Sequence, residues 1–163
     1  WMEARRNACL KAIEARLKRG VPIQRFGLQS HLNSLIRLDE KALRRFLAEL
    51  AGMGLAIEIT ELDVDDRAFP ADAALRDKGV AAFARAYLDV VLDEPAVLNV
   101  LTWDIVDKNT WLNVSDRKRR DGLPQRSLPL DADYAKKPLW FAIRDAFLAA
   151  PDHSAARAKA RLL

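Results

Sequence analysis

The sequence predicts an α/β fold built from alternating helices and parallel strands. Four segments with the spacing of helices alternate with three short strand-like runs, an order typical of parallel βα units. The strand-like runs are strongly apolar, as expected when helices cover one side of a sheet and a packed interior fills the other. Two architectures have these properties, a doubly wound open sheet and a (β/α)8 barrel. Both gather functional side chains at the C-terminal ends of their strands.

Each expected element has its own sequence signals. In chain order, the sequence predicts a helix at 1–20, a strand at 21–32, a helix at 38–54, a strand at 55–64, a loop and a long helix within 67–95, a strand at 96–106, a loop at 107–133 and a helix at 138–149. Gly20 is a natural C-terminal cap for the first helix, and Asp39 is a suitable N-cap for the second. Gly52 and Gly54 end the second helix, and Pro95 closes the third.

Composition and charge narrow the class of protein. The 163 residues are enough for one domain with a core, and 50% hydrophobic and 31% charged residues are typical of soluble globular proteins. No stretch approaches the roughly 20 apolar residues of a membrane span, and residues 1–20 resemble a charged helix rather than a signal peptide. The single cysteine, Cys9, excludes an internal disulfide and is expected to be an inert helix residue. The net charge of +4 is scattered, with a local cluster at 117–120 that is expected to be solvated, so no nucleic-acid or membrane partner is expected.

The stretch LAIEITELDV (55–64) ends in two carboxylates, Glu61 and Asp63. Strict alternation in a strand predicts that both point to the same side as Ile57 and Ile59. An acidic pair at the end of a buried strand costs free energy unless it is paired or hydrogen-bonded. Either a neighbouring group compensates the pair, or the pair serves chemistry.

Polar and aromatic residues end all three predicted strands, which read QSHL, TELDV and TWDIVDKNTW. Gln29 and His31 share one face of the first strand, so the imidazole of His31 is expected to lie between the two carboxylates of the next one. Trp103 lies near the end of the third strand, and Trp111 follows it. The convergence of these groups indicates a functional site. The chain has neither GxGxxG nor GxxxxGK[ST], which disfavours nucleotide binding.

The segments GLQSHL, ITELDV and LTWDIVDKNTWL resemble, in this order and spacing, the last three strand ends of family 10 glycoside hydrolases, and DGLPQRSLPLDADYAKKPLWFAI resembles the approach to that family's final helix. The family comprises endo-1,4-β-xylanases on a (β/α)8 barrel. The resemblance implies only the C-terminal part of this TIM barrel, strands six to eight with their helices. Residues 1–150 would form this part of the catalytic barrel, with Trp140 in its core, and residues 151–163 a polar, frayed tail.

The resemblance also implies roles for single residues. Glu61 corresponds to the catalytic nucleophile of a retaining glycosidase, which attacks the anomeric carbon. His31 and Asp63 match the positions that hold this nucleophile in its ionised form, with Asp63 orienting the imidazole. Gln29 matches a position lining the sugar site, and Trp103 and Trp111 match the aromatic walls that stack on xylose. No cofactor or metal is implied, and the expected ligand is xylan or a xylo-oligosaccharide.

The sequence departs from the family in two respects. The asparagine–glutamate motif that supplies the acid/base carboxylate has no counterpart, so little hydrolysis is expected of the isolated chain. Asp104, Val106 and Asn109 replace the residues usual at their positions, glycine in the case of Asp104.

Exposed sheet edges invite association with the missing half of the barrel or with a second copy. The alternative function is an inactive carbohydrate-binding or structural remnant. A secreted or periplasmic location is expected from the resemblance alone.

Overall fold

The computed structural model describes residues 3–114 and 116–160, and its elements follow the predicted order. They are α1 (Glu3–Lys18), β1 (Arg25–Leu28), β2 (His31–Asn33), α2 (Glu40–Gly52), β3 (Ala56–Asp65), α3 (Ala73–Leu92), β4 (Val97–Thr102), the 3-10 helices η1 (Asp107–Asn109) and η2 (Trp111–Asn113), α4 (Pro138–Ala149) and α5 (Ser154–Ala160). The carboxylate of Asp39 caps α2 by accepting from the backbone N–H of Ala42. Gly20 and Gly54 follow α1 and α2 in the left-handed conformation that ends helices.

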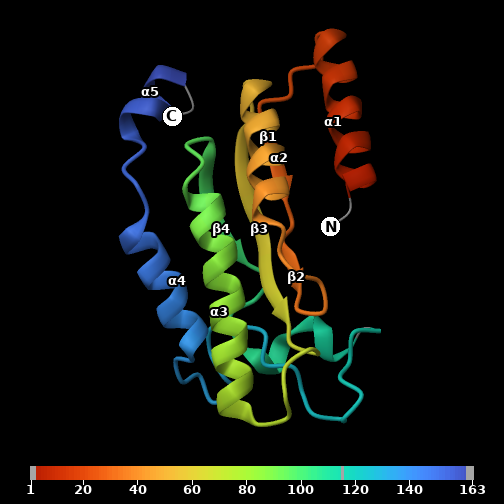
Figure 1. The fold of residues 1–163 in the computed structure, drawn as a ribbon, viewed down its shortest axis with the longest axis vertical. Helices are drawn as coiled ribbons and strands as arrows, with labels where there is room; N and C mark the ends of the chain where they lie inside the picture. The colour runs from red at the N-terminus through yellow and green to blue at the C-terminus, as the bar shows by residue number, and fades with distance from the viewer. Residues whose placement is uncertain (1–2, 115, 161–163) are drawn as a thin grey trace.

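The strands form one parallel sheet centred on β3. β4 pairs with one edge of β3, while β1 and β2 pair with successive parts of the other edge. The prediction of a single strand at 21–32 is therefore wrong in part, because the strand is interrupted at Ser30, whose φ is 65°. Figure 1 shows helices α2 and α3 lying along the strands, and the segment after β4 gathering near the C-terminal end of β3.

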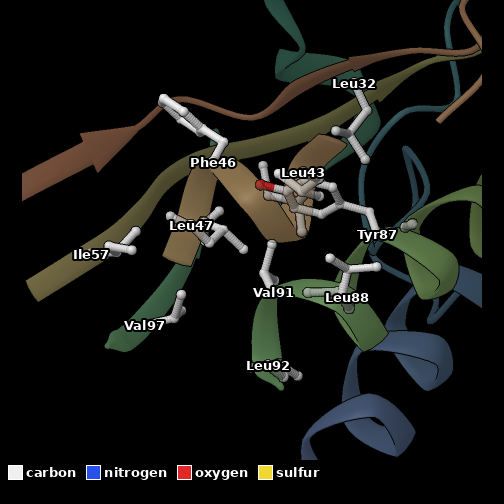
Figure 2. Close-up of a cluster of buried hydrophobic side chains, with 14 of the residues drawn as sticks. Leu32, Leu43, Phe46, Leu47, Ile57, Tyr87, Leu88, Val91, Leu92 and Val97 are labelled. Carbon is white, nitrogen blue, oxygen red and sulfur yellow. The ribbon is translucent and has the colours of Figure 1, made fainter. Parts of the chain in front are cut away.

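The hydrophobic core lies between this sheet and helices α2 and α3. Figure 2 shows Leu43 and Leu47 of α2, Leu88 and Val91 of α3, and Ile57 of β3 within one group of buried apolar side chains. Helix α4 packs along α3. The core is thus built from one face of the sheet, as parallel βα units require.

Strand β3 does not keep one alternation along its length. Ile57 and Ile59 are buried in the core cluster, and so are Leu62 and Val64, although strict alternation would place the two pairs on opposite faces. The register of β3 against β4 shifts between Ile59 and Leu62, which is the mark of a β-bulge.

The pairing with the other edge locates the extra residue. Leu28 pairs with Ile59 and His31 pairs with Asp63, so the two residues 29–30 face the three residues 60–62. Because of the extra residue, each side chain that follows it on β3 points to the face opposite the one that strict alternation predicts. The prediction that Glu61 and Asp63 point to the side of Ile57 and Ile59 is therefore wrong, since the bulge turns both carboxylates to the face opposite the helices.

The face opposite the helices is open. Leu101 of β4 and the neighbouring Trp103 have 49% and 47% of their surface exposed, and Arg25 and Gly27 of β1 are exposed as well. No helix in the described part of the chain is long and apolar enough to cross a membrane.

Two predictions for the C-terminal region are wrong. Trp140 is half-buried at the surface of α4 with the ammonium of Lys136 3.8 Å from its ring centroid, rather than in the core. The tail is not frayed over residues 154–160, which form α5. Arg157 donates to the carbonyls of Pro95 and Val97, and His153 Nε2 lies 2.8 Å from the carbonyl of Leu92, so this segment is tied to the start of β4.

Candidate active site at the strand ends

His31 lies between the two carboxylates, as predicted. Its Nε2 is 3.0 Å from Oε2 of Glu61, and its Nδ1 is 3.0 Å from Oδ2 of Asp63. Gln29 directs its amide to the other oxygen of Glu61, with Nε2 3.4 Å from Oε1. Asp63 is completely buried, whereas the side chains of His31 and Glu61 keep 17% and 19% exposure. Glu61, His31 and Asp63 thus form a row of contacting side chains, of which only the Glu61 end is open to a ligand.

The two tryptophans approach this row differently. Trp111 donates its indole N–H to Oδ2 of Asp63 at 2.7 Å, and its ring centroid lies 5.0 Å from that of His31. Trp103 meets the imidazole edge to face, with centroids 6.3 Å apart and an interplanar angle of 87°. Trp111 is therefore part of the hydrogen-bonded network, while Trp103 offers an exposed ring at its rim.

The charges of the site favour a protonated His31. Burial of the imidazole lowers its pKa, but the hydrogen bonds and negative charges of Asp63 and Glu61 outweigh burial and raise the pKa above the usual 6.5. A neutral imidazole carries one N–H, whereas carboxylates only accept. With both acids as carboxylates, both contacts are therefore hydrogen bonds only when the ring is an imidazolium.

Asp104 stands at a backbone position that suits glycine. Its φ is 74°, in the left-handed region, where side chains other than Asn and Asp are costly. Its Oδ1 accepts from the backbone N–H groups of Ile105 and Val106 at 2.6 and 3.4 Å. Asp104 thus compensates the conformation locally, next to Trp103, whose backbone N–H donates to the carbonyl of Leu62.

A buried polar network beneath the site was missed by sequence reasoning. Asp65 and Asp66 continue the ELDV run and are fully buried. The side chain of Gln125 accepts from the backbone of Asp66 at 2.7 Å and donates to Asp65 at 3.2 Å. Arg119 donates to the carboxylate and the carbonyl of Asp66 at 3.0 and 2.7 Å. The only signal was the run of acids, and the prediction of a fully solvated cluster at 117–120 is wrong for the buried Arg119.

This network anchors the segment 107–137, which carries Trp111, to the end of β3. A second group of charges does the same near α4: Lys137, Asp107, Asp77 and Arg126 form ion pairs of 2.7–3.6 Å. Within the described residues, no cluster of His, Cys, Asp and Glu is arranged to hold a metal ion. The arrangement provides one accessible carboxylate with two hydrogen-bond partners, flanked by aromatic rings.

Comparisons with known proteins agree with one another. The model of "Glycosyl hydrolase family 10" matches residues 1–146. Endo-1,4-beta-xylanase B of Thermotoga neapolitana is 31% identical over 146 residues, which are 88% of this chain and 40% of the relative. The crystal structure of native xylanase 10B from Thermotoga maritima aligns with 90% of this chain and 43% of its own, at a TM-score of 0.78 and 29% identity. Xylanase 10B from Thermotoga petrophila RKU-1, in complex with xylobiose, aligns at a TM-score of 0.75 and 28% identity over 87% of this chain and 41% of its own. The chain spans about two fifths of the length of these relatives.

Proposed function

Because the chain belongs to glycosyl hydrolase family 10, we propose that it is the part of a retaining endo-1,4-β-xylanase that carries the nucleophile, Glu61. The observation that carries the proposal is the set of contacts at Glu61. Its carboxylate reaches the open face of the sheet and is held by His31 and Gln29 at its two oxygens. Hydrogen bonds to the ionised form favour a carboxylate that can attack.

The proposed chemistry is a double displacement. An oxygen of Glu61 attacks the anomeric carbon of a xylosyl unit while the bond to the leaving oxygen breaks, and water later hydrolyses the resulting ester. His31 and Gln29 hold the attacking carboxylate in place. Trp103 and Trp111 would stack on the apolar faces of the sugar, since flat rings match such faces.

The leaving oxygen needs a proton from a second carboxyl group, about 5 Å from the nucleophile in retaining enzymes. Asp63 does not meet this need, because it is buried on the far side of His31 and is engaged by Trp111. We therefore expect little or no hydrolysis of xylan by the chain alone. The acid would come from the rest of a barrel that covers the open face.

Two surfaces suit such a complementary part. A groove of about 550 Å³ lies between α1 and β1, lined by Arg5 and Cys9 on one side and by Phe26 and Leu28 on the other. Exposed Leu101 borders the opposite edge of the sheet on β4. A native mass spectrum tests this: a complex with a larger polypeptide supports a complementary half, and a multiple of the chain mass supports self-association instead.

The nucleophile is tested with an activated aryl β-xyloside, whose leaving group needs no acid. We expect a xylosyl adduct on Glu61, located by peptide mass mapping, and no adduct in Glu61→Gln. Glu58→Gln is the matched control, because Glu58 lies on the same strand and pairs with Arg25 at 2.5 Å instead. A folded chain that acquires no label on Glu61 would remove the nucleophile from the proposal.

One observation favours a second candidate function, sugar binding without hydrolysis. Trp103 presents almost half of its surface, while of the two carboxylates that contact His31 only Glu61 is accessible. In that case, xylo-oligosaccharide affinity would be lost in Trp103→Ala and unchanged in Glu61→Gln.

A further inference from the structure

Ser30 occupies a strained position next to the site. Its φ of 65° lies in the left-handed region, which is costly for most residues other than glycine. It separates β1 from β2, and its neighbours Gln29 and His31 are the two residues that contact Glu61. Strain of this kind persists only where surrounding contacts hold it.

The contact that holds Ser30 comes from helix α3. The hydroxyl of Tyr87 lies 2.5 Å from Oγ of Ser30, and Oγ in turn donates to the carbonyl of Leu28 at 3.2 Å. Since the single proton of Ser30 is used toward Leu28, Tyr87 acts as the donor. Burial raises the pKa of Tyr87 above its usual value, so its hydroxyl is protonated at neutral pH.

Packing alone does not account for this hydroxyl. The ring of Tyr87 is 1% exposed and lies among Leu43, Leu88 and other apolar side chains in Figure 2, where phenylalanine would fill the same space. Burying a hydroxyl in such surroundings costs free energy unless it is hydrogen-bonded. Within the described residues, its hydrogen-bond partner is Ser30.

We propose that Tyr87 and Ser30 are positioning residues: their hydrogen bond anchors the break between β1 and β2 to helix α3 and thereby aims Gln29 and His31 at Glu61. The break lies opposite the bulge of β3, where residues 29–30 face 60–62. A backbone shift there would move both contacts of Glu61 together. The catalytic consequence rests on the proposed role of Glu61, whereas the geometric consequence does not.

The test uses the full chain with Tyr87→Phe, Ser30→Ala and the double variant. We expect each single change to slow labelling of Glu61 by the activated xyloside about fivefold, the effect of one lost hydrogen bond. The double variant should be no slower than the slower single one, because both changes break the same contact. Tyr134→Phe is the matched control, since the chain has two tyrosines and Tyr134 is 61% exposed and contacts Lys108 through its hydroxyl.

A second readout does not depend on catalysis. In an NMR titration, the pKa of His31 should fall in Tyr87→Phe and Ser30→Ala, because a displaced imidazole loses contact with its two carboxylates. The other histidine, His153, binds the carbonyl of Leu92 and serves as the internal reference. Ser30→Gly, which removes the hydroxyl and relieves the left-handed φ together, replaces Ser30→Ala if the latter does not fold.

The outcomes separate the two proposals. Folded variants with the parent's His31 pKa and labelling rate, or additive losses in the double variant, would overturn the positioning role. A fall in the pKa of His31 in both variants, together with no labelling of Glu61 even in the parent, would support the positioning role and reject the nucleophile.

Discussion

Lys137 gives the largest expected effect of a single substitution on stability. Its side chain is 3% exposed, and Nζ lies 2.7 Å from Oδ2 of Asp107 and 3.6 Å from Oδ1 of Asp77. Lys137→Met keeps the apolar stem but removes the countercharge. Asp77 retains its two contacts of 2.7 Å with Arg126, whereas Asp107 is left buried without its ion-pair partner. Breaking a buried ion pair in this way costs about 3–5 kcal/mol.

The loss should depend on pH in a defined direction. Burial already raises the pKa of Asp107 above 3.8, against the opposing effect of Lys137, and Lys137→Met raises it further. A carboxyl whose folded pKa lies above its unfolded pKa loses stability as pH rises between the two values. The variant should therefore be least destabilised in acid and most destabilised near neutrality.

Urea unfolding at pH 7, followed by circular dichroism, measures this loss. For a domain of this size, 3–5 kcal/mol also corresponds to a fall of about 10 °C in the melting temperature. Lys78→Met is the control, because Lys78 is exposed on α3 and surface changes alter stability by about 0.5 kcal/mol or less. Asp107→Asn should restore part of the loss in Lys137→Met. If Lys137→Met were no less stable than Lys78→Met, the ion pairs would not hold this segment.

Three further outcomes are expected around the site. Asp104→Ala keeps the left-handed φ but removes the acceptor for two N–H groups, so it should lose about 1–2 kcal/mol in urea unfolding, whereas Asp104→Gly should stay within about 0.5 kcal/mol of the parent. The raised pKa of His31 stabilises the folded state fully below the unfolded pKa near 6.5, and this stabilisation is lost as pH rises through the folded pKa. The free energy of unfolding should therefore fall with pH in this range, and His31→Gln should remove the fall. A fall that persists in His31→Gln would belong to another group. Trp111→Phe removes the donor to the buried carboxylate of Asp63, so urea unfolding should show a loss of about 1–3 kcal/mol and mass mapping a slower labelling of Glu61; an unchanged midpoint would show that His31 alone satisfies Asp63.

Much of the fold and of the site follows from local signals in the sequence. Alternating helical and apolar runs allowed an open sheet or a barrel, and the solved relatives confirm the barrel, of which this chain forms the C-terminal part. His31, Glu61 and Asp63 could be brought together because parallel strands place their C-terminal ends at one edge. Their roles, the division at residue 150 and a secreted or periplasmic location stay predictions.

The remaining features depend on contacts that no local pattern encodes. The bulge of β3 comes from pairing two residues with three, and strict alternation therefore assigned Glu61 to the wrong face. Arg119 looked like one of several surface cations, yet its partner Asp66 lies 53 positions away in the sequence. The helix at 154–160 is held by backbone carbonyls, which carry no side-chain signal.

A double displacement needs a nucleophile and an acid, and this chain provides the two to different extents. On the nucleophile side, the contacts of Glu61 come from the break between β1 and β2, and Asp63 is held by His31 and by Trp111 of η2, so the row is assembled within the described residues. On the acid side, Asp63 is buried behind His31, and Glu58 on the open face is engaged by Arg25. A complementary part would therefore need to bring one carboxyl group to a site that is already organised, rather than to build it. Labelling of Glu61 should then proceed at a similar rate with and without that part, while xylan hydrolysis should require it; a strong rise in labelling on complementation would mean that the nucleophile side also depends on the missing contacts.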